Sequence, residues 1–161
     1  PSMKSRLTIA ALLSLTAASA MAAGSDDHSH DELTIGRAGK PAEAARTIDI
    51  VMMETEDGEM KFEPATFTVK KGETLKLSFV NKGEVDHEFV MDSHEAILEH
   101  KAVMEKFPEM EHDDPNAIRL QPGGKGEIVW TFATAGEFSF GCLIPGHYES
   151  GMKGDIDVVQ N

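Results

Sequence analysis

The sequence predicts an all-β fold, an antiparallel sandwich or barrel, with one helix inserted between two strands. Short stretches in which apolar and polar residues alternate recur from residue 47 onward, as expected for half-buried strands. Glycine, proline or asparagine residues, which favour turns, bound most of these stretches. One longer stretch, residues 92–107, lacks this alternation and is rich in helix-forming residues.

Alternation identifies the strands because successive side chains of a strand point to opposite faces of the sheet. In "TIDIVMME", for example, Ile48, Ile50 and Met52 share one face. The stretches with this pattern are residues 47–54, residues 65–83 with a turn at Lys71-Gly72, residues 126–132, residues 136–142 and residues 154–159.

The helix is predicted around residues 93–107, within "DSHEAILEHKAVMEKF". Asp92 is the expected N-cap, because its carboxylate can accept from the free N–H groups of the first turn. Glu95, three residues later, is placed for a capping box. Pro108 follows the stretch and ends the helix.

The first residues predict export. Residues 1–22 combine a basic start, an apolar run at residues 7–20 and a small-x-small cleavage site at residues 20–22, which is the pattern of a cleavable secretory signal. Met3 is the expected initiator, preceded by two foreign residues. We therefore expect cleavage near Ala22 or Ala23 and a mature protein in the periplasm.

The remaining chain divides into a flexible acidic lead-in, residues 23–46, and one domain, residues 47–161. No stretch after the signal could span a membrane. The net charge of −13 argues against nucleic acid as a partner. It is compatible with a metal cation or a cationic protein partner, and it keeps an exported monomer soluble.

A cysteine, a histidine and a methionine lie close together in "GCLIPGHYESGM". Cys142 is the only cysteine, so it cannot form an internal disulfide; alone it could be a buried thiol, an intermolecular link, a nucleophile or a ligand. His147 and Met152 each follow after four intervening residues. These three donors suit copper, and His87, at the start of an expected strand, can complete a type 1 site with two imidazoles, a thiolate and a weak axial thioether.

The two ligand segments resemble those of the cupredoxins. "VDHEFVM" is similar to the family's first histidine motif, and "FSFGCLIPGHYESGMKGDIDV" to its last ligand loop and strand. The resemblance covers roughly residues 47–160 and implies a Greek-key β-sandwich holding one copper through His87, Cys142, His147 and Met152. The loop spacing is similar to that of auracyanin- and rusticyanin-like members.

The inserted helix and "KFPEMEHDDPNAIRL" resemble a narrower group, the periplasmic copper-tolerance cupredoxins of the CopI type. This resemblance implies a role in copper tolerance or homeostasis, in which one bound copper cycles between Cu(II) and Cu(I), with a redox or copper-donating protein as partner. The alternative is an electron shuttle of a respiratory or photosynthetic chain. The expected route for electrons is the edge of His147. The resemblance to carriers of the family implies that this edge is exposed through an apolar patch, which Leu143, Ile144 and Pro145 could supply.

Enzyme functions fit the sequence less well, although a Cu(I)-oxidising activity stays open. A cysteine hydrolase could pair Cys142 with His147 but leaves Met152 without a role. Multicopper oxidases need several His-x-His motifs, and only His28 and His30 have that form here. A structural zinc site would not use methionine.

Two groups of histidines could hold weak accessory copper. One is His28 and His30 in the lead-in, where a solvated acidic tail is the favoured interpretation. The other is on or beside the helix, at His94, His100 and His112. There, Ile97, His100, Met104 and Phe107 also form an ordinary packing stripe, which is the favoured interpretation.

Overall fold

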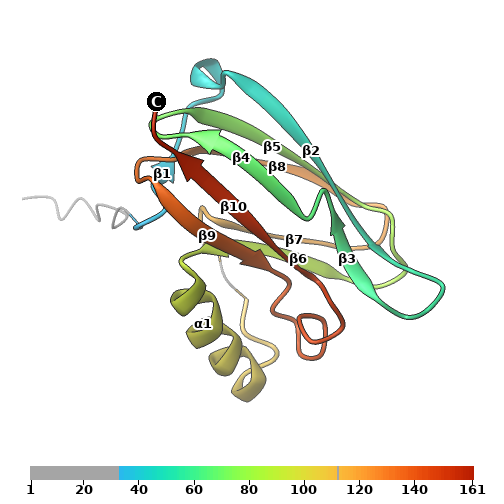
Figure 1. Cartoon of the computed structure of the whole chain (residues 1–161). Helices are drawn as coiled ribbons and strands as arrows, with labels where there is room; N and C mark the ends of the chain where they lie inside the picture. Colours follow the sequence, from blue (N-terminus) through green and yellow to red (C-terminus); the bar gives the residue numbers. More distant parts are fainter. Residues whose placement is uncertain (1–32, 112) are drawn as a thin grey trace, which may run out of the picture.

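A computed structural model describes residues 33–111 and 113–161, and shows two β-sheets packed face to face with one helix at the side (Figure 1). The first sheet has the order β1-β8-β5-β2-β3 and the second the order β4-β10-β9-β6-β7. The first sheet comprises β1 (Arg37–Ala38), β2 (Arg46–Glu54), β3 (Met60–Glu63), β5 (Thr74–Asn81) and β8 (Lys125–Thr131). The second comprises β4 (Thr66–Lys70), β6 (His87–Asp92), β7 (Ala117–Leu120), β9 (Gly136–Gly141) and β10 (Lys153–Val159).

The fold confirms the predicted all-β sandwich and its Greek-key connections, but not every pairing is antiparallel. Strands β2 and β5 run parallel, as do β4 and β10. Between β2 and β5 the chain passes through β4, which lies in the other sheet, so it returns to the first sheet in the same direction. The alternation of side chains gives no information on strand direction, which is why the sequence did not reveal these two pairings.

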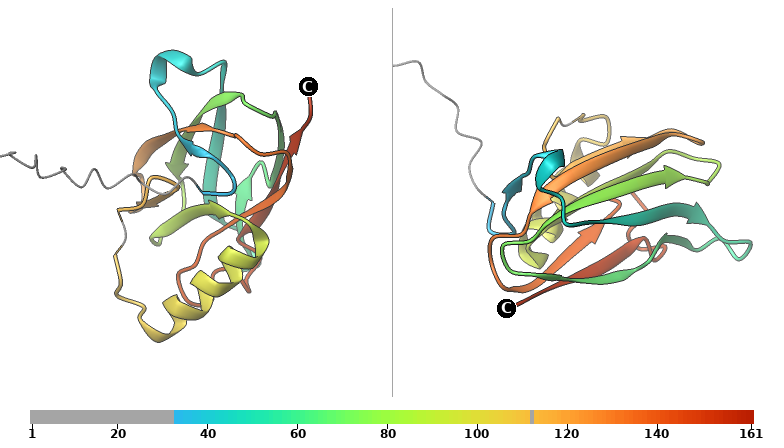
Figure 2. Two further views of the ribbon diagram at one scale, coloured as in Figure 1. Left: turned by 90° about the vertical axis from the view of Figure 1, so that its left-hand side faces the viewer. Right: turned by 90° about the horizontal axis from the view of Figure 1, so that it is seen from above.

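The two sheets lie face to face (Figure 2). The core between them is rich in phenylalanine. Phe89 of β6 lies 5.0 Å from Phe140 of β9 and 5.7 Å from Phe62 of β3, measured between ring centroids. The predicted inward face of β5 is also confirmed, because Leu75, Leu77 and Phe79 are all buried. The rigid sandwich that results carries the loops at its ends.

The described part of the lead-in belongs to this sandwich. Strand β1 pairs with β8, and a short 3-10 helix, η1 (Pro41–Glu43), leads to β2. Ile35 is fully buried in the core, and its carbonyl accepts from the indole N–H of Trp130 at 3.4 Å. This differs from the expectation of a flexible lead-in up to residue 46. The expected signal peptide, His28 and His30 lie outside the described residues.

The predicted helix is α1 (His94–Lys106), between β6 and β7. Its N-cap is Ser93, whose hydroxyl accepts from the N–H of Ala96 at 3.2 Å, and not Asp92 as predicted. Asp92 is the last residue of β6 and its carboxylate accepts from the Ser93 N–H at 2.7 Å. The strand therefore extends one residue further than expected and displaces the cap.

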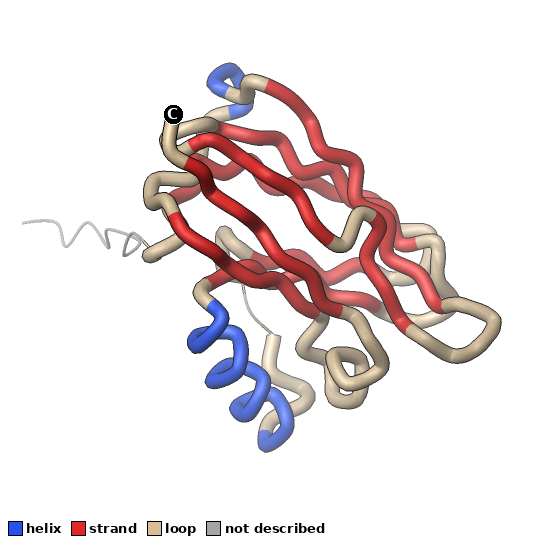
Figure 3. The backbone as a smooth tube through the Cα atoms, in the orientation of Figure 1, coloured by secondary structure: helices blue, strands red, loops and turns tan. Residues whose placement is uncertain are grey.

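Helix α1 packs on the outer face of the second sheet, beside β6 and β9 (Figure 3). Ile97 and Met104 are fully buried there, against Val90 and Leu143. Phe107, the fourth member of the predicted stripe, is 60 % exposed, because it is the C-cap residue beyond the last helical turn. In the described part of the chain no helix has the length and apolarity needed to cross a bilayer.

Candidate metal centre

His87 is the first residue of β6 and its side chain is fully buried. Its Nε2 lies 2.9 Å from a carboxylate oxygen of Glu54. Its other ring nitrogen, Nδ1, is buried and has no hydrogen-bond partner among the described residues. Burial lowers the pKa of His87, although the nearby Glu54 carboxylate acts in the opposite direction. A neutral imidazole with one buried nitrogen left over is suited to bind a metal.

Cys142 directly follows β9 and is also fully buried. Its sulfur lies 3.3 Å from Nδ1 of His147 and accepts from the backbone N–H of Glu88 at 3.3 Å. Burial raises the pKa of the Cys142 thiol to about 12, even though the N–H of Glu88 favours the thiolate. The free protein therefore holds a neutral thiol, and a metal cation would have to replace its proton.

The loop between β9 and β10 folds back on itself through backbone hydrogen bonds. The N–H of Cys142 donates to the carbonyl of Met152 at 3.0 Å, and the N–H of Met152 donates to that of His147 at 3.1 Å. Gly146 and Gly151 have φ values of +87° and +103°, which favour glycine. These turns bring the three residues of the sequence motif to the end of the sandwich where His87 lies.

His147 is partly buried and lies beside His87, with 5.2 Å between the ring centroids. Burial, followed by the neighbouring His87, lowers the pKa of His147. Met152 is fully buried in the main core cluster. Its backbone is hydrogen-bonded to those of Cys142 and His147, and its role as axial ligand stays a prediction.

The metal-binding atoms of His87, Cys142 and His147 all lie within 4.8 Å of one another. Within residues 33–111 and 113–161 they form the one such group of three or more His, Cys, Asp or Glu side chains. Two imidazoles and one thiolate are the donor set of a copper electron-transfer site. The buried Nδ1 of His87 provides a structural reason to place a metal there, independent of the sequence motif.

Glu54, at the end of β2, was not among the candidate site residues predicted from the sequence. Its two oxygens contact Nε2 of His87 and the backbone N–H groups of Glu84 and Val85. Burial alone would raise the pKa of Glu54, but these donors hold it below its ordinary value. Because Glu54 and His87 lie 33 residues apart on different sheets, no local pattern could have linked them.

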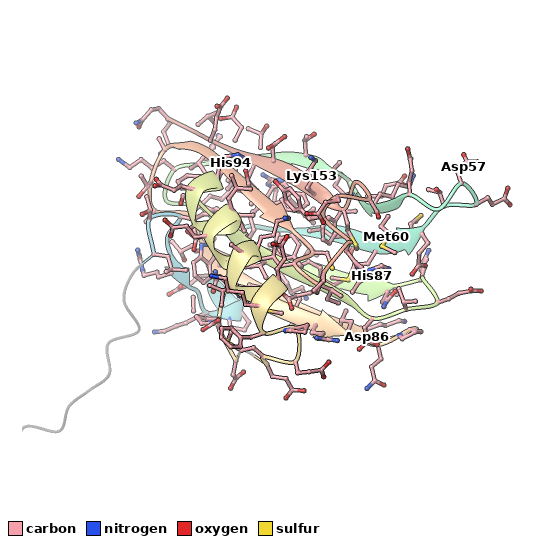
Figure 4. All side chains as sticks on the ribbon, turned by 90° about the horizontal axis from the view of Figure 1, so that it is seen from below. Asp57, Met60, Asp86, His87, His94 and Lys153 are labelled. Atoms are coloured by element: carbon pink, nitrogen blue, oxygen red, sulfur yellow. The ribbon has the colours of Figure 1, made fainter. Side chains whose placement is uncertain are left out.

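The helix histidines do not join the centre. His94 lies at the start of α1, well away from His87 (Figure 4), and its Nδ1 is 3.2 Å from the hydroxyl of Ser139. His100 is partly buried. Among the described residues, neither His94 nor His100 lies in a group of three or more side chains that could hold a metal ion. Met104 is a core residue, as the favoured interpretation expected. His112 lies outside the described residues.

One predicted feature of the surface is wrong. Leu143 does not contribute to an exposed apolar patch, because its side chain is buried between the loop and α1. Ile144 is partly buried and Pro145 is exposed, so these two residues remain beside the His147 edge.

Comparisons with known proteins agree with this centre. The family described as "Copper binding proteins, plastocyanin/azurin family" matches residues 50–159. The copper-resistant cuproprotein CopI of Rubrivivax gelatinosus is 42% identical over 168 residues, which cover 97% of this chain and 99% of that protein. The CopI protein of Pseudomonas aeruginosa is 33% identical and covers 74% of this chain and 81% of its own length.

Solved structures give the same result for the fold. Dithionite-reduced auracyanin from Roseiflexus castenholzii is 26% identical and superposes with a TM-score of 0.59, over 72% of this chain and 98% of that one. A multicopper oxidase from Campylobacter jejuni superposes with a TM-score of 0.53 over 78% of this chain and 32% of its own, but at 14% identity it shares the fold alone.

Proposed function

The chain belongs to the plastocyanin/azurin family of copper-binding proteins, and from this premise we propose that it is a periplasmic cupredoxin that serves copper resistance. We propose His87, Cys142 and His147 as the ligands of one copper, with Met152 as the axial ligand. The observation that carries this proposal is the grouping of three donor side chains, two buried and one partly buried, in which Nδ1 of His87 has no hydrogen-bond partner among the described residues.

The protein's own groups suit a site that changes oxidation state with little rearrangement. Copper, when bound, supplies a one-electron couple between Cu(II) and Cu(I). The backbone N–H of Glu88 points at the Cys142 sulfur and stabilises its thiolate. Burial of Cys142 and His87 excludes water, and the loop hydrogen bonds hold His147 near the thiolate. His147, less buried than His87, offers the edge through which an electron can pass to a partner.

The relatives favour resistance over a role as a plain carrier. Both curated proteins described above are named copper-resistant cuproproteins, and the relative from Rubrivivax gelatinosus spans nearly the whole chain. The secretory pattern of residues 1–22, a basic start followed by an apolar run and a small-x-small site, supports export to the periplasm.

The proposal is tested by titrating the purified protein with Cu(II) while recording optical and EPR spectra. We expect intense visible thiolate bands that saturate at one copper per chain. Cys142→Ala should abolish these bands, while His94→Ala, on the helix, should retain them. Bands that persist in Cys142→Ala, or a wild-type thiol that stays freely titratable after copper addition, would show that the ligand assignment is wrong.

The physiological part needs a separate test. A copper-sensitive bacterium that expresses the exported wild-type protein should grow at higher copper concentration than one that expresses Cys142→Ala. Equal growth of the two strains, with spectroscopically normal wild-type protein in both the periplasm and the purified state, would favour the electron-carrier alternative.

A further inference from the structure

The Glu54 side chain, at the end of β2 in the first sheet, contacts His87 of the candidate metal centre in the second sheet. The assignment of His87 as a ligand does not by itself explain why a carboxylate lies there. We propose that Glu54 is a positioning residue of this centre: it fixes the ring of His87 in the tautomer that binds metal, and its negative charge favours oxidised copper. This inference rests on the proposed function, because it concerns the same site.

The tautomer follows from the chemistry of the contact. A carboxylate can only accept hydrogen bonds, so the 2.9 Å contact requires the proton of neutral His87 to lie on Nε2. Nδ1 then carries the lone pair. Nδ1 is also the atom that is buried without a hydrogen-bond partner among the described residues. Nε2 therefore donates to the carboxylate, while the lone pair of Nδ1 is left for a metal, as carboxylate–histidine–metal arrangements require.

The same carboxylate also fixes the loop that leads to His87. Its Oε2 accepts from the N–H of Glu84 at 3.0 Å, and its Oε1 accepts from the N–H of Val85 at 3.3 Å. Gly83 lies so close to Glu54 that a Cβ atom there would overlap the carboxylate. One carboxylate therefore bonds both the loop and the imidazole, and the ring of His87 cannot rotate without breaking its hydrogen bond to Glu54.

Asn81 also anchors the loop that precedes His87. The loop therefore does not depend on Glu54 alone, and the main effect of Glu54 is on the imidazole ring of His87. The Asn81 amide donates to the carbonyls of Val85 and Leu120 and accepts from the N–H of Gly83. Removal of Glu54 should therefore leave the loop in place and release His87. This separation makes the positioning role measurable without loss of the fold.

The charge of Glu54 has a second consequence. Because Cu(II) carries one more positive charge than Cu(I), a carboxylate that acts through the imidazole stabilises the oxidised state more. Glu54→Gln keeps an oxygen that can accept from Nε2–H but removes the charge. We expect it to change the ratio of Cu(II) to Cu(I) affinity by about tenfold in favour of Cu(I), equivalent to about +59 mV for one electron.

The first experiment uses the copper-free protein, so it does not depend on the redox function. Long-range ¹H–¹⁵N correlation spectra at pH 8 should show His87 as the Nε2–H tautomer in the wild type and in Glu54→Gln. In Glu54→Ala the signals should shift towards a mixture of tautomers. A wild-type Nδ1–H tautomer, or a Glu54→Ala spectrum identical to that of the wild type, would overturn the positioning role.

The second experiment measures the reduction potential of the copper-loaded protein. Glu84→Gln is the matched control, since Glu84 is exposed on the adjoining loop and loses the same formal charge. Glu54→Gln should raise the potential clearly more than Glu84→Gln. Equal shifts would overturn the charge effect even where the wild type shows normal thiolate bands. Absence of those bands in the wild type would instead count against the proposed function, and the tautomer result would still stand on its own.

Discussion

The inserted helix is held to the sandwich mainly by two side chains, so truncating one of them should cost measurable stability. Met104 is fully buried, with an exposed fraction of 0%. It belongs to a small apolar cluster with Ile97, Val90 and Leu143. Replacement by alanine removes the Cγ, Sδ and Cε atoms from this small cluster.

The cost can be worked from burial. Loss of these atoms forfeits about 2 kcal/mol of transfer free energy, and the cavity adds about 1 kcal/mol after partial relaxation of a helix that lies on the outside of a sheet. We therefore expect Met104→Ala to lower the free energy of unfolding by about 3 kcal/mol. For a domain of this size the melting temperature should fall by about 10 °C.

Urea denaturation of the copper-free protein measures this directly. Val103→Ala is the control: Val103 is the neighbouring residue of α1, is 41% exposed and should change stability by less than about 0.5 kcal/mol. Equal effects of the two substitutions, or a change below about 1 kcal/mol in Met104→Ala, would refute the view that Met104 anchors the helix. Copper-loaded Met104→Ala should keep its thiolate bands, because no ligand comes from α1.

Further predictions concern the ligands and their loop. Added imidazole should restore the thiolate bands of His147→Gly more readily than those of His87→Gly, because His147 is only partly buried whereas His87 is fully buried; optical titration decides. Met152→Leu should retain the bands but shift the reduction potential in voltammetry. Asn81→Ala leaves two carbonyls and one N–H without their partner and should cost about 2–4 kcal/mol in urea denaturation. Since the Cys142 thiol has a pKa of about 12 and both ligand histidines have lowered pKa values, copper binding at pH 8 should release about one proton per chain, measured by calorimetry in buffers of different ionisation enthalpy.

The strands and the candidate ligands could be proposed from the sequence because their signals are local. Alternation over a few residues reveals a strand, and Cys142, His147 and Met152 lie within one loop whose glycines mark its turns. His87 was found by a different route, since it was the histidine left at the start of a strand once those in the lead-in and near the helix were set aside. Each of these inferences needs only neighbouring residues and the chemistry of a donor set.

The features that the sequence did not reveal depend on contacts between distant segments. The parallel pairing of β2 with β5 follows from a crossing between sheets, and the role of Glu54 follows from where the end of β2 meets the loop before β6. The N-cap was displaced because β6 extends through Asp92, a boundary that tertiary pairing decides. Ile35 was assigned to a flexible segment because its partner, Trp130, lies 95 residues away.

The helix looked like an insertion in the sequence, yet its contacts make it part of the support of the copper loop. Leu143, next to Cys142, is buried against α1, and Lys101 of α1 pairs with Glu149 and lies 6.0 Å from the ring centroid of Tyr148, next to His147. The opposite side of the centre is held by Glu54 from the first sheet. The Cys142 sulfur and both imidazoles are thus braced by elements that supply none of the candidate ligands. Their arrangement is set in the metal-free protein, as the proposed one-electron site with little rearrangement requires.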